Sequence, residues 1–249
     1  MDKHDKSITI GTGDMAKDWD ERAREDYRYY IDTGNNATDA EFDASGKHDV
    51  AAIVQPIYDR IKHGSMLEVG CGAGRMTQHL VKMFELVIGV DCSGEMLKRA
   101  LERMPKNSAP DDPESNAVFY WTNGIKIRIK PDYVDYALCY AVLDHIPRRD
   151  YIVTLLTEIY RVLKPGGMAT LEIGGCGLEE GESVDTAGTW RGVLWTVESF
   201  SKVLGEIGFT IKEMVDKPDY ISTVKLFHVR KPGRILLKGG LSNESFRIE

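Results

Sequence analysis

The sequence predicts an α/β fold: a Rossmann-like, doubly wound, mainly parallel seven-stranded sheet with an antiparallel last strand, plus a helical cap at the N-terminus. Two observations predict the parallel part. Short apolar strands alternate with amphipathic helices over residues 65–173, and a Gly-Cys-Gly-Ala-Gly turn at residues 70–74 follows the first strand. A third observation predicts the antiparallel edge. The strands expected at 209–215 and 222–230 are joined by a link too short for a helical crossover, so they should form a hairpin.

The N-terminal region is expected to be helical. A helix at residues 14–31 carries four residues at helical spacing on one side: Trp19, Ala23, Tyr27 and Tyr30. This helix either packs on the core or forms a lid whose aromatic rings cover a ligand. A second helix is expected at residues 47–62, where Pro56 should kink or split it.

The remaining elements follow from hydrophobic periodicity and from breaks at glycine and proline. Strands are expected at residues 65–69, 86–90, 117–121, 133–139 and 168–173, and helices at 75–83, 94–103, 148–163 and 197–207. Gly208 should end the last of these helices. A glycine-rich loop at residues 174–192 interrupts the pattern, and loops of this length in compact domains are usually functional or disordered.

These patterns divide the chain into four parts. Residues 1–13 are polar and should be a mobile N-terminus, and residues 14–62 form the helical cap or lid. Residues 63–231 form the Rossmann-like domain, and residues 232–249 form a C-terminal tail.

Composition narrows the class of protein. Of the 249 residues, 42% are hydrophobic and 29% are charged, so the chain can bury a sizeable core. The formal net charge of −7 argues against nucleic acid or an anionic membrane as partner, because both require a basic face. We expect no signal peptide and no membrane span. The four cysteines form no Cys-x-x-Cys pair, so we expect reduced thiols in a cytoplasmic protein.

The chemistry-bearing residues fall at the carboxyl ends of the expected strands. The glycine turn, Asp91, Asn123 and residues 140–145 should therefore meet in one cleft. Glycines let a ligand approach the main chain, and the helix that follows offers free N–H groups, so the turn is suited to a polar, nucleoside-sized molecule. The alternative is a tight turn without a ligand. A dinucleotide site would need glycine where Arg75 stands.

Several segments resemble class I S-adenosylmethionine-dependent methyltransferases, in the order of that family. Residues 68–74 resemble its motif I, residues 89–97 its second-strand motif, residues 140–147 motif IV of its small-molecule branch, and residues 161–167 the turn before its fifth strand. The resemblance spans about residues 65–230, and the terminal hairpin matches the family's reversed seventh strand. It implies S-adenosyl-L-methionine as cofactor and residues 63–231 as the domain that binds it.

The resemblance also implies roles for individual residues. Those expected to contact the cofactor are Trp19, Glu68, Gly70, Cys71, Gly72, Gly74, Asp91, Cys92, Met96, Asn123, Gly124, Ile125, Tyr140 and Ala141. In this assignment the glycines, Glu68, Tyr140 and Ala141 face the methionine part, and Asp91 holds the ribose hydroxyls. Cys92, Met96 and residues 123–125 surround the adenine, where Asn123 replaces a frequent acid but keeps an acceptor oxygen. The alternative for Met96 and Ile125 is a role in the core, and Trp19 would cover the sulfonium.

Methyl transfer from a sulfonium is an in-line displacement, so the main task of the protein is to align the nucleophile with the methyl group. An oxygen or nitrogen nucleophile must also lose a proton. His145 is the candidate base because imidazole titrates near neutral pH, and Asp144 is the second choice. Alternatively, His145 supports the next helix and Asp144 orients an amine. The acceptor site is expected to involve Tyr27, Tyr30, His48 and Trp190. No metal-ligand spacing is present.

The sequence thus favours a methyltransferase that acts on a small-molecule acceptor. Two alternatives stay open: the same fold acting on protein or RNA, and a regulator that binds the cofactor without turnover. A nicotinamide oxidoreductase is opposed by Arg75.

Overall fold

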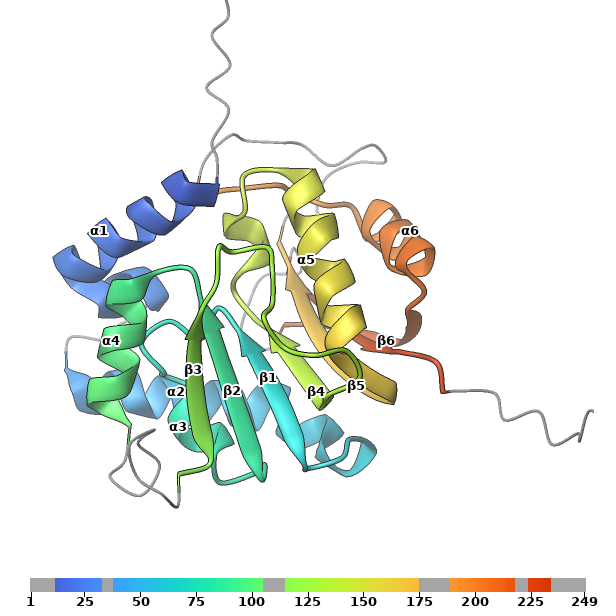
Figure 1. Ribbon diagram of the computed structural model, residues 1–249, viewed down its shortest axis with the longest axis horizontal. Helices are drawn as coiled ribbons and strands as arrows, with labels where there is room; N and C mark the ends of the chain where they lie inside the picture. The colour runs from blue at the N-terminus through green and yellow to red at the C-terminus, as the bar shows by residue number, and fades with distance from the viewer. Residues whose placement is uncertain (1–11, 33–37, 105–114, 175–188, 218–223, 234–249) are drawn as a thin grey trace, which may run out of the picture.

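A computed structural model describes residues 12–32, 38–104, 115–174, 189–217 and 224–233. Within them, seven strands form one sheet in the order β3-β2-β1-β4-β5-β7-β6 (Figure 1). The strands are β1 (Ser65–Val69), β2 (Leu86–Asp91), β3 (Ala117–Trp121), β4 (Val134–Cys139), β5 (Leu163–Ile173), β6 (Thr210–Asp216) and β7 (Lys225–Arg230). The predicted fold class is confirmed.

Strand direction defines where a ligand can bind. Strands β3, β2, β1, β4 and β5 pair in parallel, and β7 pairs antiparallel with both β5 and β6. The strand order reverses between β1 and β4, whose register matches Val69 with Cys139. Parallel α/β sheets bind ligands beyond the carboxyl ends of the strands at such a reversal.

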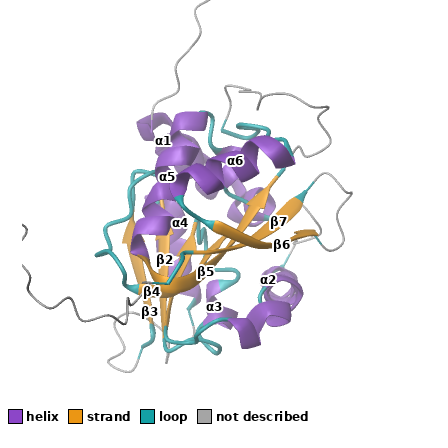
Figure 2. Ribbon diagram, turned by 90° about the vertical axis from the view of Figure 1, so that its right-hand side faces the viewer, coloured by secondary structure: helices purple, strands orange, loops and turns teal. Residues whose placement is uncertain are grey.

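Helices cover both faces of the sheet. Helices α5 (Arg149–Val162) and α6 (Val197–Ile207) pack on one face, and α2 (Asp39–Ile53) and α3 (Thr77–Leu80) on the other (Figure 2). Helix α4 (Gly94–Arg103) contacts the edge strand β3. Strand β4 is buried along its whole length, as expected for a central strand covered on both sides.

Local capping explains the elements that match their predicted bounds. Helices α4 and α6 begin where predicted because Ser93 and Thr196 accept hydrogen bonds from the backbone N–H groups of Met96 and Ser199. Gly208 ends α6 in the left-handed region, with φ 108°. Strand β3 also has its predicted bounds.

Other bounds differ from prediction. Helix α2 begins at Asp39 rather than at residue 47, because Thr38 and Glu41 form a capping box. Pro56 does split this region: a separate 3₁₀ helix, η1, spans Gln55–Arg60. The helix predicted at 75–83 contains only Thr77–Leu80 as α-helix. Strand β5 begins at Leu163, five residues before the predicted start, so no separate turn precedes it.

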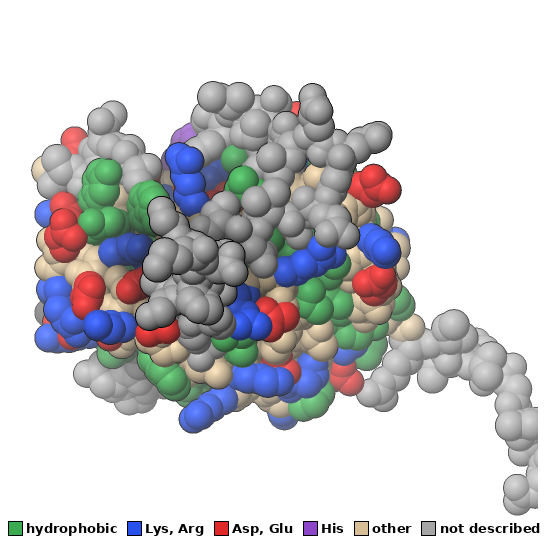
Figure 3. All heavy atoms as spheres, turned by 90° about the horizontal axis from the view of Figure 1, so that it is seen from above, with side chains coloured by type: hydrophobic (Ala, Val, Ile, Leu, Met, Phe, Trp, Pro, Cys, Tyr) green, Lys and Arg blue, Asp and Glu red, His purple; other side chains and the backbone are tan. Residues whose placement is uncertain are grey.

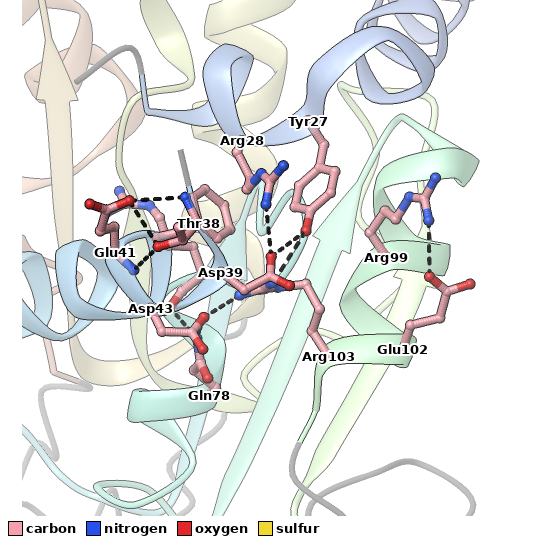
Figure 4. Close-up of polar contacts among 12 residues, drawn as sticks. Tyr27, Arg28, Thr38, Asp39, Glu41, Asp43, Gln78, Arg99, Glu102 and Arg103 are labelled. Atoms are coloured by element: carbon pink, nitrogen blue, oxygen red, sulfur yellow. Dashed lines mark hydrogen bonds and ion pairs between the residues drawn. The ribbon is translucent and has the colours of Figure 1, made fainter. Parts of the chain in front are cut away.

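The cap helices are attached to the domain by charged side chains. Helix α1 (Thr12–Ile31) lies across the carboxyl ends of the strands (Figure 1) and is interrupted at Asp26, whose carboxylate accepts from the N–H groups of Arg28 and Tyr29. Arg103 of α4 donates to the Tyr27 hydroxyl at 3.2 Å and to Asp39 at 3.0 Å, and it also pairs with Asp43 (Figure 4). One arginine therefore joins α1, α2 and α4.

Three sequence expectations fall largely on residues outside those described: the mobile N-terminus at 1–13, the glycine-rich loop at 174–192 and the tail at 232–249. The division into four parts stays a prediction.

Candidate functional site

A pocket opens at the carboxyl ends of β1, β2 and β4 and reaches α1. Of the cofactor-binding and catalytic residues proposed from the sequence, it is lined by Trp19, Glu68, Gly70, Cys71, Gly72, Asp91, Cys92, Met96, Gly124, Tyr140, Ala141 and His145. Four others are absent from its lining: Gly74, Asn123, Ile125 and Asp144. The topology thus brings most of the proposed residues to one place. Their individual roles stay predictions.

The glycine turn needs backbone freedom at each of its glycines. Gly70, Gly72 and Gly74 have φ values of 68°, 51° and 75°, in the region that disfavours other residues. A Cβ atom on Gly70 would lie 2.3 Å from Cγ2 of Val142. A Cβ on Gly74 would instead lie 3.3 Å from Cβ of Ala100, so Gly74 allows the turn to pack on α4. Packing on α4 is therefore an alternative role for Gly74 to the predicted contact with the cofactor.

Asp91 links the glycine turn to the start of α4. Its carboxylate accepts from the N–H of Gly72 at 2.9 Å and from the N–H of Ser93 at 2.8 Å. Burial raises the pKa of Asp91, and these backbone donors oppose that shift. A carboxylate has about four lone-pair positions, so acceptor capacity is left over for ligand hydroxyls.

Glu68 is a buried carboxyl at the end of β1, with 5% of its surface exposed. The Thr77 hydroxyl donates to it at 2.6 Å. Desolvation raises the pKa of Glu68 to about 7, although the Thr77 hydroxyl and the Arg75 guanidinium oppose the shift. Such a group can accept hydrogen bonds from an ammonium group, and it attracts a positive charge more strongly once ionised.

Asn123 uses its acceptor oxygen locally. The side-chain oxygen accepts from the N–H groups of Ile125 and Lys126, at 3.3 and 3.0 Å, in a tight turn. The neighbouring Thr122 and the buried Ile127 line the pocket in its place. The predicted contact between Asn123 and an adenine amine would compete with this turn.

His145 and aromatic side chains from three segments meet at the α1 end of the pocket. The His145 ring lies 5.2 Å from the Trp19 ring and 5.5 Å from the Trp190 ring, and the Tyr30 ring lies 5.5 Å from Trp190. The guanidinium of Arg22, which the sequence analysis missed, lies 4.8 Å from the Trp19 ring centre. It donates to the Thr189 hydroxyl at 3.0 Å and so ties α1 to this segment.

The His145 ring has a defined hydrogen-bond partner. Its Nδ1 atom lies 2.9 Å from the backbone carbonyl oxygen of Trp190. Because a carbonyl oxygen only accepts, Nδ1 must carry the proton, and in the neutral ring the lone pair is then on Nε2. The arrangement leaves Nε2 able to accept a proton.

The other proposed acceptor residues lie elsewhere. Tyr27 points its hydroxyl to Asp39 and Arg103, outside the pocket lining (Figure 4). His48 is exposed beside Asp49. Asp144 lies next to Gly174, where an added Cβ would be 3.6 Å from its carboxylate.

Tyr30, proposed for the acceptor site, does line the pocket. Other lining residues were missed because their contacts depend on tertiary structure: Met15, Ile31, Arg75, Met76 and Val142. Arg75 is buried and pairs with Asp49 at 2.6 Å and with Asp32 at 3.6 Å. Its place one residue after the glycine turn was the available signal. Among the described residues, no cluster of three or more His, Cys, Asp or Glu could hold a metal ion.

Comparison with known proteins agrees with this geometry. A family model described as "Methyltransferase domain" matches residues 67–171. "Probable methyltransferase ltbC" of Aspergillus luteorubrus is 35% identical over 106 residues, which cover 41% of this chain and 37% of that protein. "Phosphoethanolamine N-methyltransferase 2" of Caenorhabditis elegans is 28% identical over 161 residues, covering 62% and 35%. The chain thus matches little more than a third of either relative.

Solved structures show the same fold. The N-methyltransferase NodS from Bradyrhizobium japonicum WM9, in complex with S-adenosyl-L-homocysteine, superposes with a TM-score of 0.62 at 17% identity, covering 88% of this chain and 98% of that chain. The sheet order, the glycine turn and the pocket define a class I S-adenosylmethionine-dependent methyltransferase fold. The match of residues 67–171 to the methyltransferase-domain model makes this part of the chain similar to that family.

Proposed function

We propose that the protein is an enzyme that transfers the methyl group of S-adenosyl-L-methionine to an oxygen or nitrogen atom of a small-molecule acceptor by in-line displacement. The observation that carries the proposal is the position of His145. Its ring lies on the wall of the pocket that also contains Asp91 and Glu68, and its Nδ1 is directed at the Trp190 carbonyl.

The residues present fit the cofactor. Gly70 and Gly72 bring the backbone of the turn to the pocket surface, and Asp91 keeps acceptor capacity for ribose hydroxyls. We place the adenine near Cys92, Met96 and Gly124, and the methionine part near Glu68. When bound, the cofactor supplies a methyl group activated by positively charged sulfur, which the Trp19 ring can face.

The chain's own residues then orient the acceptor and move its proton. The Trp19 and Tyr30 rings line the pocket and form an apolar wall beside the acceptor, and Trp190 packs against both rings. Nε2 of His145 accepts the proton that an acceptor hydroxyl or ammonium loses. The Trp190 carbonyl stabilises the resulting imidazolium through Nδ1–H.

A small acceptor is supported by the relatives and by charge. One relative is named for phosphoethanolamine, a small polar molecule. On the face that carries the carboxyl ends of the strands, the described acidic and basic side chains are mixed (Figure 3). That distribution favours a small molecule over RNA, which would need a basic stripe.

We further propose a cytoplasmic location. No helix in the described part of the chain is long and apolar enough to cross a membrane. Cys71, Cys92 and Cys139 are free thiols, as expected for a reducing compartment. Cell fractionation would test this.

The decisive experiment is calorimetric titration with S-adenosyl-L-methionine and, separately, with NAD. Incubation of cell extract with labelled cofactor and mass spectrometry then identifies the methylated product. We expect binding of S-adenosyl-L-methionine alone and label in a small molecule. Absence of binding would refute the proposal. Label in protein or RNA would refute the small-molecule acceptor, and binding without any transfer would favour a regulator.

A further inference from the structure

A buried ion pair lies directly behind the Tyr140–Ala141 part of the pocket wall. Glu172 is near the carboxyl end of β5, and Lys217 follows the last residue of β6. The Lys217 Nζ atom lies 3.2 Å from Glu172 Oε1, and the two side chains are only 7% and 5% exposed. Burial of a charged pair is costly, so a pair of this kind indicates a task other than filling space.

Both members of the pair contact the pocket wall. Glu172 Oε2 accepts from the backbone N–H of Ala141 at 3.2 Å. The Lys217 ammonium lies 4.4 Å from the centre of the Tyr140 ring, within range of a cation–π contact. Tyr140 and Ala141 themselves line the pocket. Tyr140 and Ala141 therefore lie between the ion pair and a ligand in the pocket.

Ala141 needs this support because of its backbone. Its φ of 54° lies in the left-handed region, which a residue with a Cβ rarely adopts. Such a conformation persists only where the surrounding structure holds it. The Glu172 carboxylate holds the N–H of this residue, and Lys217 offsets the buried negative charge. Burial raises the pKa of Glu172 to about 7; the Lys217 ammonium opposes this shift, and the like charge of Asp144 adds to it.

We propose that Glu172 and Lys217 are positioning residues that hold Tyr140 and Ala141 in the conformation that receives the methionine part of the cofactor. This inference rests on the proposed function. Neither residue touches the reacting atoms. Their effect is on the segment that runs from the end of β4 into the loop carrying His145.

The chain offers a matched control. Asp135 of β4 and Lys164 of β5 form an ion pair at 2.7 Å, near the ends where these strands begin. Asp135 is 6% exposed, similar to Glu172. Neither Asp135 nor Lys164 lines the pocket. Loss of this control pair tests whether removing a buried carboxylate elsewhere in the sheet has the same effect.

The test compares two ligands by calorimetry: S-adenosyl-L-homocysteine and 5′-methylthioadenosine, which lacks the amino-acid part. The variants are Glu172→Gln, Lys217→Met, the double variant, and Asp135→Asn as control. Each single variant at the pocket should weaken S-adenosyl-L-homocysteine binding by at least about tenfold, with 5′-methylthioadenosine changed by about threefold or less. The double variant removes both charges but keeps an acceptor for the Ala141 N–H, so it should regain most of the affinity. Asp135→Asn should bind both ligands like the wild type.

Two results would overturn the inference alone. One is unchanged S-adenosyl-L-homocysteine affinity in both single variants. The other is equal weakening of both ligands together with a fall in thermal stability, which would indicate a purely structural role. If the wild-type protein binds neither ligand, the proposed function and this inference fail together.

Discussion

Nδ1 of His145 lies 2.9 Å from the carbonyl oxygen of Trp190, which is 45 residues further along the chain. This contact sets the tautomer in which Nε2 has the lone pair. It also orients the ring, because Trp190 packs against both His145 and Trp19. A base held in this way can act on an acceptor without first reorienting.

The first prediction concerns His145→Ala. Turnover of the acceptor identified with labelled cofactor should fall by about 10²–10⁴-fold, because the variant lacks a positioned base. Affinity for S-adenosyl-L-methionine should change by about threefold or less. Steady-state kinetics and calorimetry measure the two effects. The control is Asp144→Asn, since the Asp144 side chain is absent from the pocket lining and should affect turnover much less. A larger loss for Asp144→Asn than for His145→Ala would reverse the two roles.

The second prediction concerns Asp91→Ala, which removes the acceptor assigned to the ribose hydroxyls. We expect cofactor affinity to fall by at least about tenfold, equivalent to about 1.4 kcal/mol. Part of the loss comes from the N–H groups of Gly72 and Ser93, which lose their partner. Asp91→Asn keeps one acceptor oxygen and should lie between the wild type and Asp91→Ala. Calorimetric titration with S-adenosyl-L-homocysteine measures the series, and unchanged affinity in Asp91→Ala would show that the ribose binds elsewhere.

Local signals explain how much of the fold could be predicted. The bounds of α4 and α6 follow from Ser93, Thr196 and Gly208, which act within one or two turns of the chain. The same kind of signal was present for α2, in the Thr38 and Glu41 capping box, but it was not used to place the start of the helix. The mainly parallel sheet followed from the alternation of strands and helices, which limits the possible topologies.

The candidate site was predictable only where the contacts follow the topology. Asp91 and Gly72 meet because adjacent parallel strands end together. By contrast, Arg22 contacts Thr189 across 167 residues, and Glu172 contacts Lys217 across 45. Such pairs depend on how the cap and the terminal hairpin pack, and no periodicity encodes that. The use of Asn123 in its own tight turn is a local feature that the sequence could have indicated.

The third prediction concerns Arg103→Leu. This change removes the side chain that joins Tyr27 of α1 and Asp39 of α2 to α4 (Figure 4). Amides of residues 12–31 and 39–53 should exchange with deuterium faster, by about tenfold, while those of β1 and β4 should not change. The control is Glu102→Gln, which breaks only the pair with Arg99 inside α4. Equal exchange in the two variants would mean that apolar packing, and not Arg103, holds the cap.

The fourth prediction follows from the buried carboxyl of Glu68. Its pKa is about 7 in the folded protein against 4.5 for an unperturbed glutamate, so between these values the folded state binds more protons than the unfolded state. The free energy of unfolding should therefore fall as pH rises from about 4.5 to 7, by up to about 3 kcal/mol from this group. Glu68→Gln cannot ionise and should escape this loss.

The measurement is urea unfolding of the ligand-free wild type and Glu68→Gln across that range. The two proteins should be similar in stability near the acid end, and the variant should be the more stable above pH 7, since only the wild type then carries a buried negative charge. Thr77→Val tests the cause. Its hydroxyl stabilises the ionised form through the 2.6 Å hydrogen bond, so its removal should extend the wild-type decline to higher pH. Parallel stability curves for the wild type and Glu68→Gln would contradict this prediction. They would show that ionisation of Glu68 costs no free energy in the folded protein. The surroundings of Glu68 would then be more polar than its buried position at the end of β1 implies.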